Sequence, residues 1–368
     1  VDRKTDSITL TDKRNGRVFK GLNVFVDHGD RGDEYNFTPP ENDKSFTPLI
    51  DKVNTFTEGM VSTMVIDYNF DLPVSLVENR GSRAKKMVKC ALRSTLTMVS
   101  GVPRVDVRTE FDNLAQDHRL SAHFPSGVIS DYARMDGHFD VLKRSIDLPK
   151  TDPTWVELPR PEVPQRAFCD VCDENSGLMI TNRGLPEVAV VRQEDGTAEI
   201  ALTLLRCVGW LSRGDLWNRK GHAGPGLPTP GAQEIGRHIF EYAIIPHSGN
   251  LQDAAQIAYA FVTPLKASTS GLHPGTITAT CAFVSCSTSE FVITAIKPTE
   301  KGDGWLMRGY NNSDNPIQVR LTTKLEFNRA SEVFMDESHK RSLNTEVDGS
   351  LLVAVAEHEI LTIKFENA

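Results

Sequence analysis

An alternation of apolar and polar residues with a period of two restricts the fold of this 368-residue chain more than any other feature. From Val105 to Asp112, valine, threonine and phenylalanine alternate with charged residues. This pattern is typical of an antiparallel strand with one face in a core and the other in water. A turn at Ser100–Pro103 and a second alternating stretch at Leu92–Met98 complete a predicted β-hairpin.

The same period recurs along the chain, whereas helical spacing is scarce. One short helix is predicted at residues 251–258, after Ser248-Gly249-Asn250, which can cap its start. Many strands and few helices indicate an all-β sandwich fold, because a parallel α/β core would need a helix between strands. The other alternating stretches are Val18–Val26, Ile200–Leu204, Ile317–Leu321 and Leu361–Phe365.

The length of the chain predicts two domains, because one domain usually has fewer residues. Small polar residues at 285–289 mark the boundary, so we expect a large β-sandwich at 1–288 and a smaller β domain at 289–368. The segment 211–234 is rich in glycine and proline and interrupts the strands. A long irregular loop of this kind usually serves binding or packing against a partner.

Charge and hydropathy exclude some classes of protein. A net charge of −8 and a pI near 5.7 argue against nucleic-acid binding, which needs basic surfaces. No apolar run reaches about 18 residues, so we expect no membrane span. The first residues have no apolar segment typical of a signal peptide, and we expect a cytoplasmic protein.

The six cysteines do not predict a disulfide framework or a metal site. Cys169-Asp170-Val171-Cys172 is a single CxxC, and a structural zinc site needs a second pair. The motif also lies in a predicted strand, where positions i and i+3 face opposite sides. We therefore expect reduced, partly buried thiols.

The stretch 25–40 concentrates Asp27, Asp30, Asp33 and Glu34 around two glycines. Such carboxylates can bind the hydroxyls of a sugar, a cation, or an arginine of the same chain. A Ca²⁺ or Mg²⁺ site is one interpretation, although the spacing differs from the helix-flanked calcium loop. A pair of catalytic carboxyl groups is another, although neighbouring side chains in one loop usually point apart.

Several motifs, in this order along the chain, resemble those of the C-terminal β region of glycoside hydrolase family 38, the retaining α-mannosidases. Together they cover nearly the whole chain, and the bacterial members look most similar. The motifs are Gly29–Phe37, Gly137–Arg144, Phe168–Pro186, Leu204–Arg206, Arg213–Leu216, Arg219–Pro225, Thr229–Gln233, Phe240–His247, Ala295–Lys297 and Arg308–Asn312.

The resemblance implies a large antiparallel supersandwich, similar to galactose mutarotase, followed by a smaller β-sandwich. In the family, a zinc ion and an aspartate nucleophile lie mainly on an N-terminal α/β barrel. The His-x-Asp of this chain, His138-Phe139-Asp140, lies in a predicted strand. We therefore expect no catalytic residue and no cofactor here, with zinc in the missing domain of a parent α-mannosidase. The barrel of that parent and its α-mannoside are the implied partners, and the isolated chain should be inactive.

The resemblance also suggests which residues of this chain contact the substrate. Tyr35 follows the acidic loop, at the position where a tyrosine of the family reaches the sugar. The family lends an arginine from the region that here holds Arg206, Arg213, Asp215 and Arg219. An internal ion-pair network is the alternative role for these four residues. His222 lies in the same loop and could titrate near neutral pH.

Two other functions remain open. A free-standing carbohydrate-binding module would use exposed tryptophans as platforms for sugar rings. A mutarotase-like epimerase would need a histidine, namely His222, His238 or His247, together with Glu241 as acid and base. The number of chains that assemble, including a homo-oligomer, is also left open. The candidate platform residues are Trp155, Trp210, Trp217 and Trp305.

Overall fold

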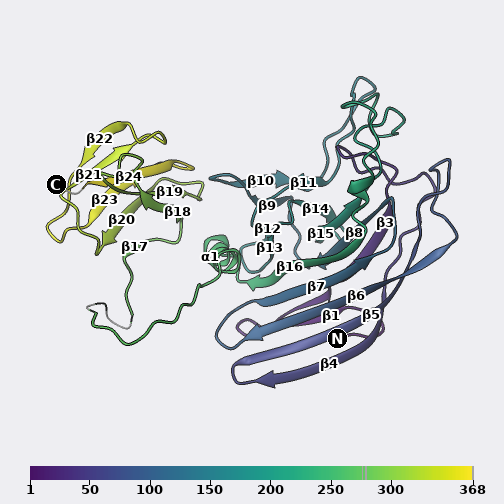
Figure 1. Cartoon of the computed structure of the whole chain (residues 1–368), viewed down its shortest axis with the longest axis horizontal. Helices are drawn as coiled ribbons and strands as arrows, with labels where there is room; N and C mark the ends of the chain where they lie inside the picture. The colour runs from purple at the N-terminus through teal and green to yellow at the C-terminus, as the bar shows by residue number, and fades with distance from the viewer. Residues whose placement is uncertain (276, 278–279, 367–368) are drawn as a thin grey trace. The chain divides into compact units, whose positions relative to one another are not determined.

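The computed structural model describes residues 1–275, 277 and 280–366 and is built almost entirely from antiparallel β-strands (Figure 1). Its contacts divide the chain into two compact units. The first unit comprises Val1–Met135 and Lys143–Val262, and the second comprises Asp136–Leu142 and the chain from Thr263 onward. Residues 263–288 thus belong to the second unit, whereas the division made from sequence assigned them to the first domain.

The first unit is a sandwich of two sheets, and a short hairpin lies beside them. Neighbouring strands from β9 to β4 run antiparallel in the larger sheet. In order, that sheet contains β10 (Val141–Ser145), β9 (Tyr132–Asp136), β12 (Phe168–Cys172), β13 (Gly177–Arg183), β16 (Gly236–His247), β7 (Val105–Asn113), β6 (Met87–Val99), β5 (Val61–Pro73) and β4 (Leu49–Glu58).

The second sheet of this unit has five antiparallel strands. Its order is β11 (Glu162–Pro164), β14 (Glu187–Arg192), β15 (Ala198–Cys207), β8 (His118–Pro125) and β3 (Val24–Gly29), and the hairpin consists of β1 (Ile8–Asp12) and β2 (Arg17–Leu22).

The alternation in sequence places the core between these sheets. Val105, Val107 and Phe111 of β7 are buried, and Leu92 pairs with Phe111 in the predicted hairpin. Their polar neighbours form the outer face, where Arg93 of β6 lies opposite a glutamate of β7. Burial of many apolar side chains is the main stabilising contribution to such a sandwich. The all-β fold, the hairpin and the alternating strands other than the stretch 18–26 are confirmed.

The predicted helix is also confirmed, as α1 (Leu251–Val262), which packs against β12, β13 and β16. Its start is capped as expected, because the Asp253 backbone N–H donates to Asn250 Oδ1 at 3.2 Å. A 3₁₀-helix, η1 (Pro230–Gln233), ends the irregular segment 211–234. Among the described residues, no helix is both long and apolar enough to cross a membrane.

Two local predictions from sequence are wrong. The stretch 18–26 is not one strand, because Asn23 adopts a φ of 58° and separates β2 from β3. His138-Phe139-Asp140 is not part of a strand but forms the turn between β9 and β10, where Phe139 also has a φ of 58°. A positive φ interrupts an extended strand, and it is rare for a bulky residue such as phenylalanine.

The second unit is a smaller β-sandwich with its own core. Trp305 stacks on Phe365 with ring centroids 4.0 Å apart, and Phe327 meets the same ring edge-on. Its sheets are β17 (Val284–Cys286), β20 (Ile317–Thr323) and β23 (Leu351–Val355), and β18 (Phe291–Pro298), β19 (Gly304–Asn311), β24 (Ile360–Glu366), β21 (Arg329–Val333) and β22 (His339–Leu343).

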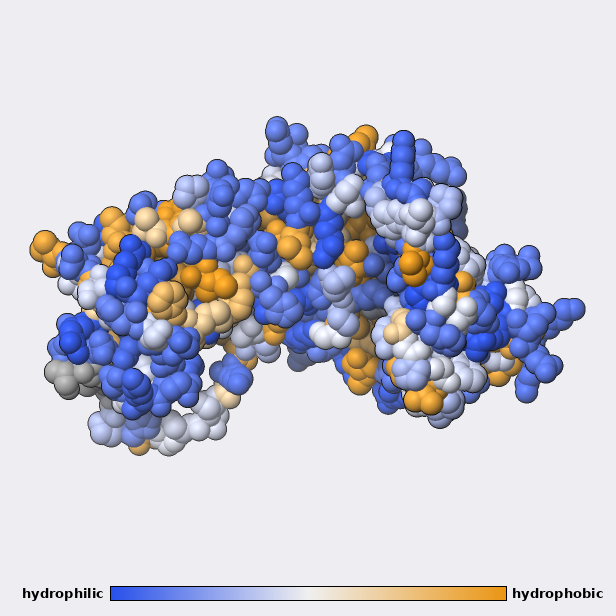
Figure 2. Space-filling view, turned by 90° about the horizontal axis from the view of Figure 1, so that it is seen from above, coloured by the Kyte–Doolittle hydropathy of each residue, from blue (hydrophilic) through white to orange (hydrophobic). Residues whose placement is uncertain are grey.

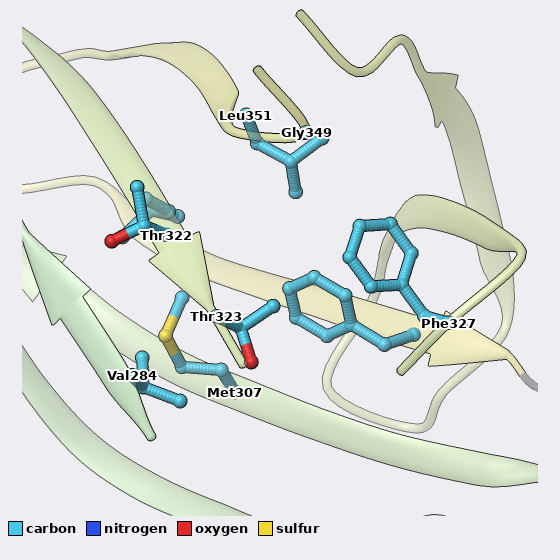
Figure 3. A pocket seen from close by; sticks show the side chains of 9 residues that line it. Val284, Met307, Thr322, Thr323, Phe327, Gly349 and Leu351 are labelled. Carbon is cyan, nitrogen blue, oxygen red and sulfur yellow. The ribbon is translucent and has the colours of Figure 1, made fainter. Parts of the chain in front are cut away.

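A small apolar cavity lies inside this second core. Figure 3 shows Val284, Met307, Thr323, Phe327 and Leu351 around it. Its volume is about 10 Å³, which is at most enough for one water molecule. The cavity is therefore a packing gap and not a ligand site.

A buried charge cluster in the first unit generates a testable prediction. The carboxylate of Asp27 lies 2.5 Å from both Arg83 Nη2 and His118 Nδ1, and His118 Nε2 lies 3.0 Å from Asn113 Oδ1. Acceptors on both ring nitrogens fit an imidazolium. Burial alone would lower the pKa of His118, but Asp27 outweighs burial and raises that pKa to about 10.

Because this pKa is raised on folding, the stabilisation by His118 is complete below pH 6.5 and is lost as the pH rises through about 10. The free energy of unfolding should fall over that range, with a His118 contribution of up to about 1.4 kcal/mol per pH unit. Urea unfolding at a series of pH values measures it. His118→Gln should be less stable and should lack this slope, whereas an unchanged slope would show that His118 is neutral.

Candidate functional site

The acidic stretch that begins in β3 directs three of its four carboxylates into the protein, whereas Glu34 is exposed. Asp27, Asp30 and Asp33 are all fully buried. A buried carboxylate is tolerated only with a partner of opposite charge or several hydrogen bonds. Each of the three has an arginine within hydrogen-bond distance. Of the three interpretations made from sequence, the structure shows the arginine of the same chain.

Arg206, which β15 contributes, closes the loop from one side. Its Nε donates to Asp30 Oδ2 at 2.8 Å, and its Nη2 donates to the carbonyl oxygens of Asp33 and Asn36, both at 2.5 Å. The Gly32 backbone N–H donates to Asp30 Oδ1 at 2.7 Å. The guanidinium group of Arg206 therefore holds the loop in two ways, by an ion pair with Asp30 and by hydrogen bonds to two backbone carbonyl oxygens.

Arg219, which lies in the segment 211–234, closes the loop from the other side. Its Nη2 lies 2.5 Å from Asp33 Oδ2, and its Nη1 donates to the amide oxygen of Asn36. Burial raises the pKa of Asp33, but hydrogen bonds from Arg219 and from the Arg213 backbone outweigh it and hold that pKa below its usual range. For Asp30, burial is the larger effect and raises the pKa despite Arg206.

The arginines predicted to contact substrate thus differ in orientation. Arg206 and Arg219 use their donors on Asp30, Asp33 and backbone carbonyls, and Arg219 is almost completely buried. Arg213 instead makes a two-point contact with Asp215, at 2.8 and 2.7 Å, and the Asp215 side chain is 49% exposed. For all four residues, a contact with substrate stays a prediction.

Tyr35 lies on the surface of the loop, with 54% of the residue exposed. Its ring lies against Gly224 of the segment 211–234, where an added Cβ would come within 2.8 Å of the phenol oxygen. A side chain at position 224 would therefore have to displace the phenol of Tyr35. The hydrogen bonds of Arg206 to the carbonyl oxygens of Asp33 and Asn36 hold the backbone on both sides of Tyr35.

Two open clefts are lined by residues of this region. The tyrosine cleft has a volume of about 370 Å³ and includes Tyr35, Trp155, Glu157, Arg160, Glu162 and Glu187. The arginine cleft has a volume of about 500 Å³ and includes Trp210, Ser212, Arg213, Asp215 and His222. Both volumes fall in the range of small-molecule sites. Figure 2 shows a largely hydrophilic surface, with hydrophobic residues in separate patches.

The histidines proposed for an epimerase do not face Glu241. His238 lies on β16 three residues before Glu241, so the two side chains leave opposite faces of the strand, and His238 Nε2 lies 2.7 Å from the Glu234 carbonyl oxygen. His222 lines the arginine cleft, whereas His247 is buried and lies 2.8 Å from Asp170. Glu241 forms an ion pair with Arg183 at 3.1 Å. An acid and a base acting on one sugar must face the same cleft, and these residues do not.

The two thiols of the CxxC motif show no reactive character. Cys169 lies in the core and Cys172 is partly buried, and burial raises the pKa of both thiols. Within the described part of the chain, no group of three His, Cys, Asp or Glu side chains could hold a metal ion.

The tyrosine cleft contains residues that sequence reasoning did not find. Glu157, Arg160, Glu162 and Glu187 follow no known motif. The segment 153–161 is bounded by prolines and exposes Trp155, which is a signal of an ordered surface loop. That signal indicates a loop but does not reveal which carboxylates come together.

The buried ion pair of Arg219 and the partly exposed ion pair of Arg213 lead to a prediction about stability. Arg219→Ala leaves Asp33 buried without its charge partner and should lower the free energy of unfolding of the first unit by roughly 3–5 kcal/mol. Arg213→Ala, which breaks a partly exposed pair, should lower it by less than about 1 kcal/mol. Urea unfolding followed by tryptophan fluorescence measures both. Equal losses would contradict the distinction.

Comparison with known proteins supports the motif-based assignment. Residues 1–211 match the model of the glycosyl hydrolases family 38 C-terminal domain. Residues 290–363 match that of the glycosyl hydrolases family 38 C-terminal beta sandwich domain. The first match alone covers more than half of the chain.

Individual relatives agree. A protein named "Putative mannosylglycerate hydrolase" from Halalkalibacterium halodurans is 25% identical over 99% of this chain and 40% of its own length. The crystal structure of an α-mannosidase from Enterococcus faecalis V583 covers the whole chain with a TM-score of 0.84 and 26% identity. A second family 38 structure from Enterococcus faecalis gives a TM-score of 0.83 and 25% identity.

The chain spans about two fifths of the length of these relatives, namely 40% of the curated protein and 41% and 42% of the two solved chains. The family models, the order of the motifs and the two-sandwich architecture agree over both units. The chain therefore belongs to glycoside hydrolase family 38 and spans the C-terminal β domains of that family.

Proposed function

We propose that this chain is the C-terminal portion of a retaining α-mannosidase-like glycoside hydrolase. In this proposal its loop end supports a catalytic barrel and lends side chains to the carbohydrate site. The barrel, with a zinc ion and an aspartate nucleophile, belongs to the rest of the protein. The observation that carries the proposal is the match of the whole chain to two fifths of an α-mannosidase.

The local geometry supports a role in lending side chains rather than in catalysis. Tyr35 presents a half-exposed phenol, which can donate and accept a hydrogen bond and can pack its ring on a sugar. Arg213 and Asp215 line the adjacent arginine cleft and are also partly exposed. We propose these three residues as the substrate contacts of this chain, with Arg206 and Arg219 as supports.

The substrate is an α-mannoside in this proposal. The two relatives suggest different leaving groups, because one is called an α-mannosidase and the other a mannosylglycerate hydrolase. The position of Tyr35 on the tyrosine cleft supports a contact with the sugar that such substrates share.

Removal of the phenol hydroxyl tests this role. In the full-length enzyme that contains this chain, Tyr35→Phe should lower kcat/KM for an aryl α-mannoside about tenfold, because one hydrogen bond to the substrate is lost. Stability should not change, since Tyr35 is exposed. Steady-state kinetics and thermal unfolding together measure the two effects.

Tyr132→Phe is the matched control, because Tyr132 is 48% exposed on β9 and lies outside both clefts. It should leave kcat/KM unchanged. Wild-type kinetics in the Tyr35→Phe enzyme would remove Tyr35 from the substrate site.

A further inference from the structure

The tyrosine cleft has exposed aromatic side chains of the kind that pack against sugar rings. Trp155 and Tyr35 present partly exposed aromatic surfaces, 39% and 54% exposed, on the same opening. A sugar ring has faces formed by C–H groups, which pack against aromatic rings, and a rim of hydroxyl groups. A sugar that packs on these exposed aromatic rings would remove their apolar surface from water, which favours binding.

The carboxylates of the cleft are held in place and keep acceptors available. Glu157 Oε1 accepts from Asn36 Nδ2 at 2.5 Å, and Asn36 is anchored in turn by Arg219. Glu187 Oε1 accepts from Thr203 Oγ1 at 2.8 Å. The described residues offer no hydrogen bond to Oε2 of either glutamate, so each retains an oxygen that can accept from a hydroxyl group.

The charge of the cleft restricts its ligand. Three carboxylates line the cleft, from Glu157, Glu162 and Glu187, and Arg160 supplies the guanidinium group among its described lining residues. Arg119 does not line the cleft, but it pairs with Glu162 and Glu187. Three negative and two positive charges leave one negative charge in excess. Glu162 forms ion pairs with both arginines, at 2.7 Å from Arg119 and 3.2 Å from Arg160. Glu187 shares Arg119 at 3.3 Å, whereas none of the described residues forms an ion pair with Glu157. An anionic ligand would therefore be repelled by the carboxylate of Glu157.

From these observations we propose that the tyrosine cleft is a binding site for a neutral sugar ring. Trp155 supplies the platform, and Glu157 and Glu187 accept hydrogen bonds from sugar hydroxyls. All of these groups belong to this chain, so the site operates without the rest of the enzyme. The proposal thus goes beyond the proposed function, in which the chain completes a site centred on another domain.

Titration of the 368-residue chain with methyl α-mannoside, followed by tryptophan fluorescence and calorimetry, tests the site. Binding should be saturable in the millimolar range. Trp155→Ala and Glu157→Gln should each weaken it roughly fivefold to tenfold, because each removes one favourable contact. Both residues are exposed, so the variants should fold, and thermal unfolding verifies this.

Matched controls lie on β4, outside the cleft. Phe56→Ala removes an exposed aromatic side chain and Glu58→Gln removes an exposed carboxylate, and neither should change affinity. Mannose 6-phosphate should bind more weakly than the neutral sugar. If Trp155→Ala does not fold, the affinity of the Glu157→Gln variant for methyl α-mannoside still tests the site.

Three results would overturn the site: no saturable binding by the wild-type chain, unchanged affinity in the folded Trp155 or Glu157 variants, or equal or tighter binding of mannose 6-phosphate. Each is separate from the proposed function, which depends on turnover by the full-length enzyme. A loss of turnover in Tyr35→Phe together with absent binding here would reject the cleft and leave the catalytic role intact.

Discussion

Neutralisation of buried carboxylates is the constraint that determines the candidate site. Asp30 and Asp33 lie in an irregular loop, and their partners Arg206 and Arg219 are 176 and 186 residues away in sequence. An unpaired charge at these positions would cost several kcal/mol. The loop can therefore adopt its structure only when β15 and the segment 211–234 are in place, and Tyr35 is positioned as a consequence.

This arrangement separates residues that hold the site from residues that face it. Arg206 and Arg219 point inward and bind backbone carbonyls as well as carboxylates. Tyr35, Arg213, Asp215 and Trp155 lie on the clefts, where they are accessible to a ligand. A substitution in the first group should act through stability, whereas one in the second should act through binding.

Strands and the helix could be predicted because their signals are local. The alternation at 105–112 and the spacing of Leu251, Ala254 and Ala258 follow directly from burial of one face. The turn at 138–140 could not, because Phe139 adopts a backbone conformation that its residue type disfavours. The family motifs identified the loop that carries Tyr35, but no local pattern links an aspartate near residue 30 to an arginine near residue 206. Glu187 of the tyrosine cleft is 25 residues beyond Glu162 in sequence and lies on another strand, so only the fold brings it to Glu157 and Glu162.

The central claim is that this chain provides a wall of a carbohydrate site while the reaction takes place on another part of the protein. Hydrolysis of an aryl α-mannoside by the purified 368-residue chain, with and without added zinc, tests it most directly against the full-length enzyme. The account predicts turnover by the full-length enzyme and none by the isolated chain under either condition. Zinc-dependent turnover by the isolated chain, abolished by a chelator, would contradict it.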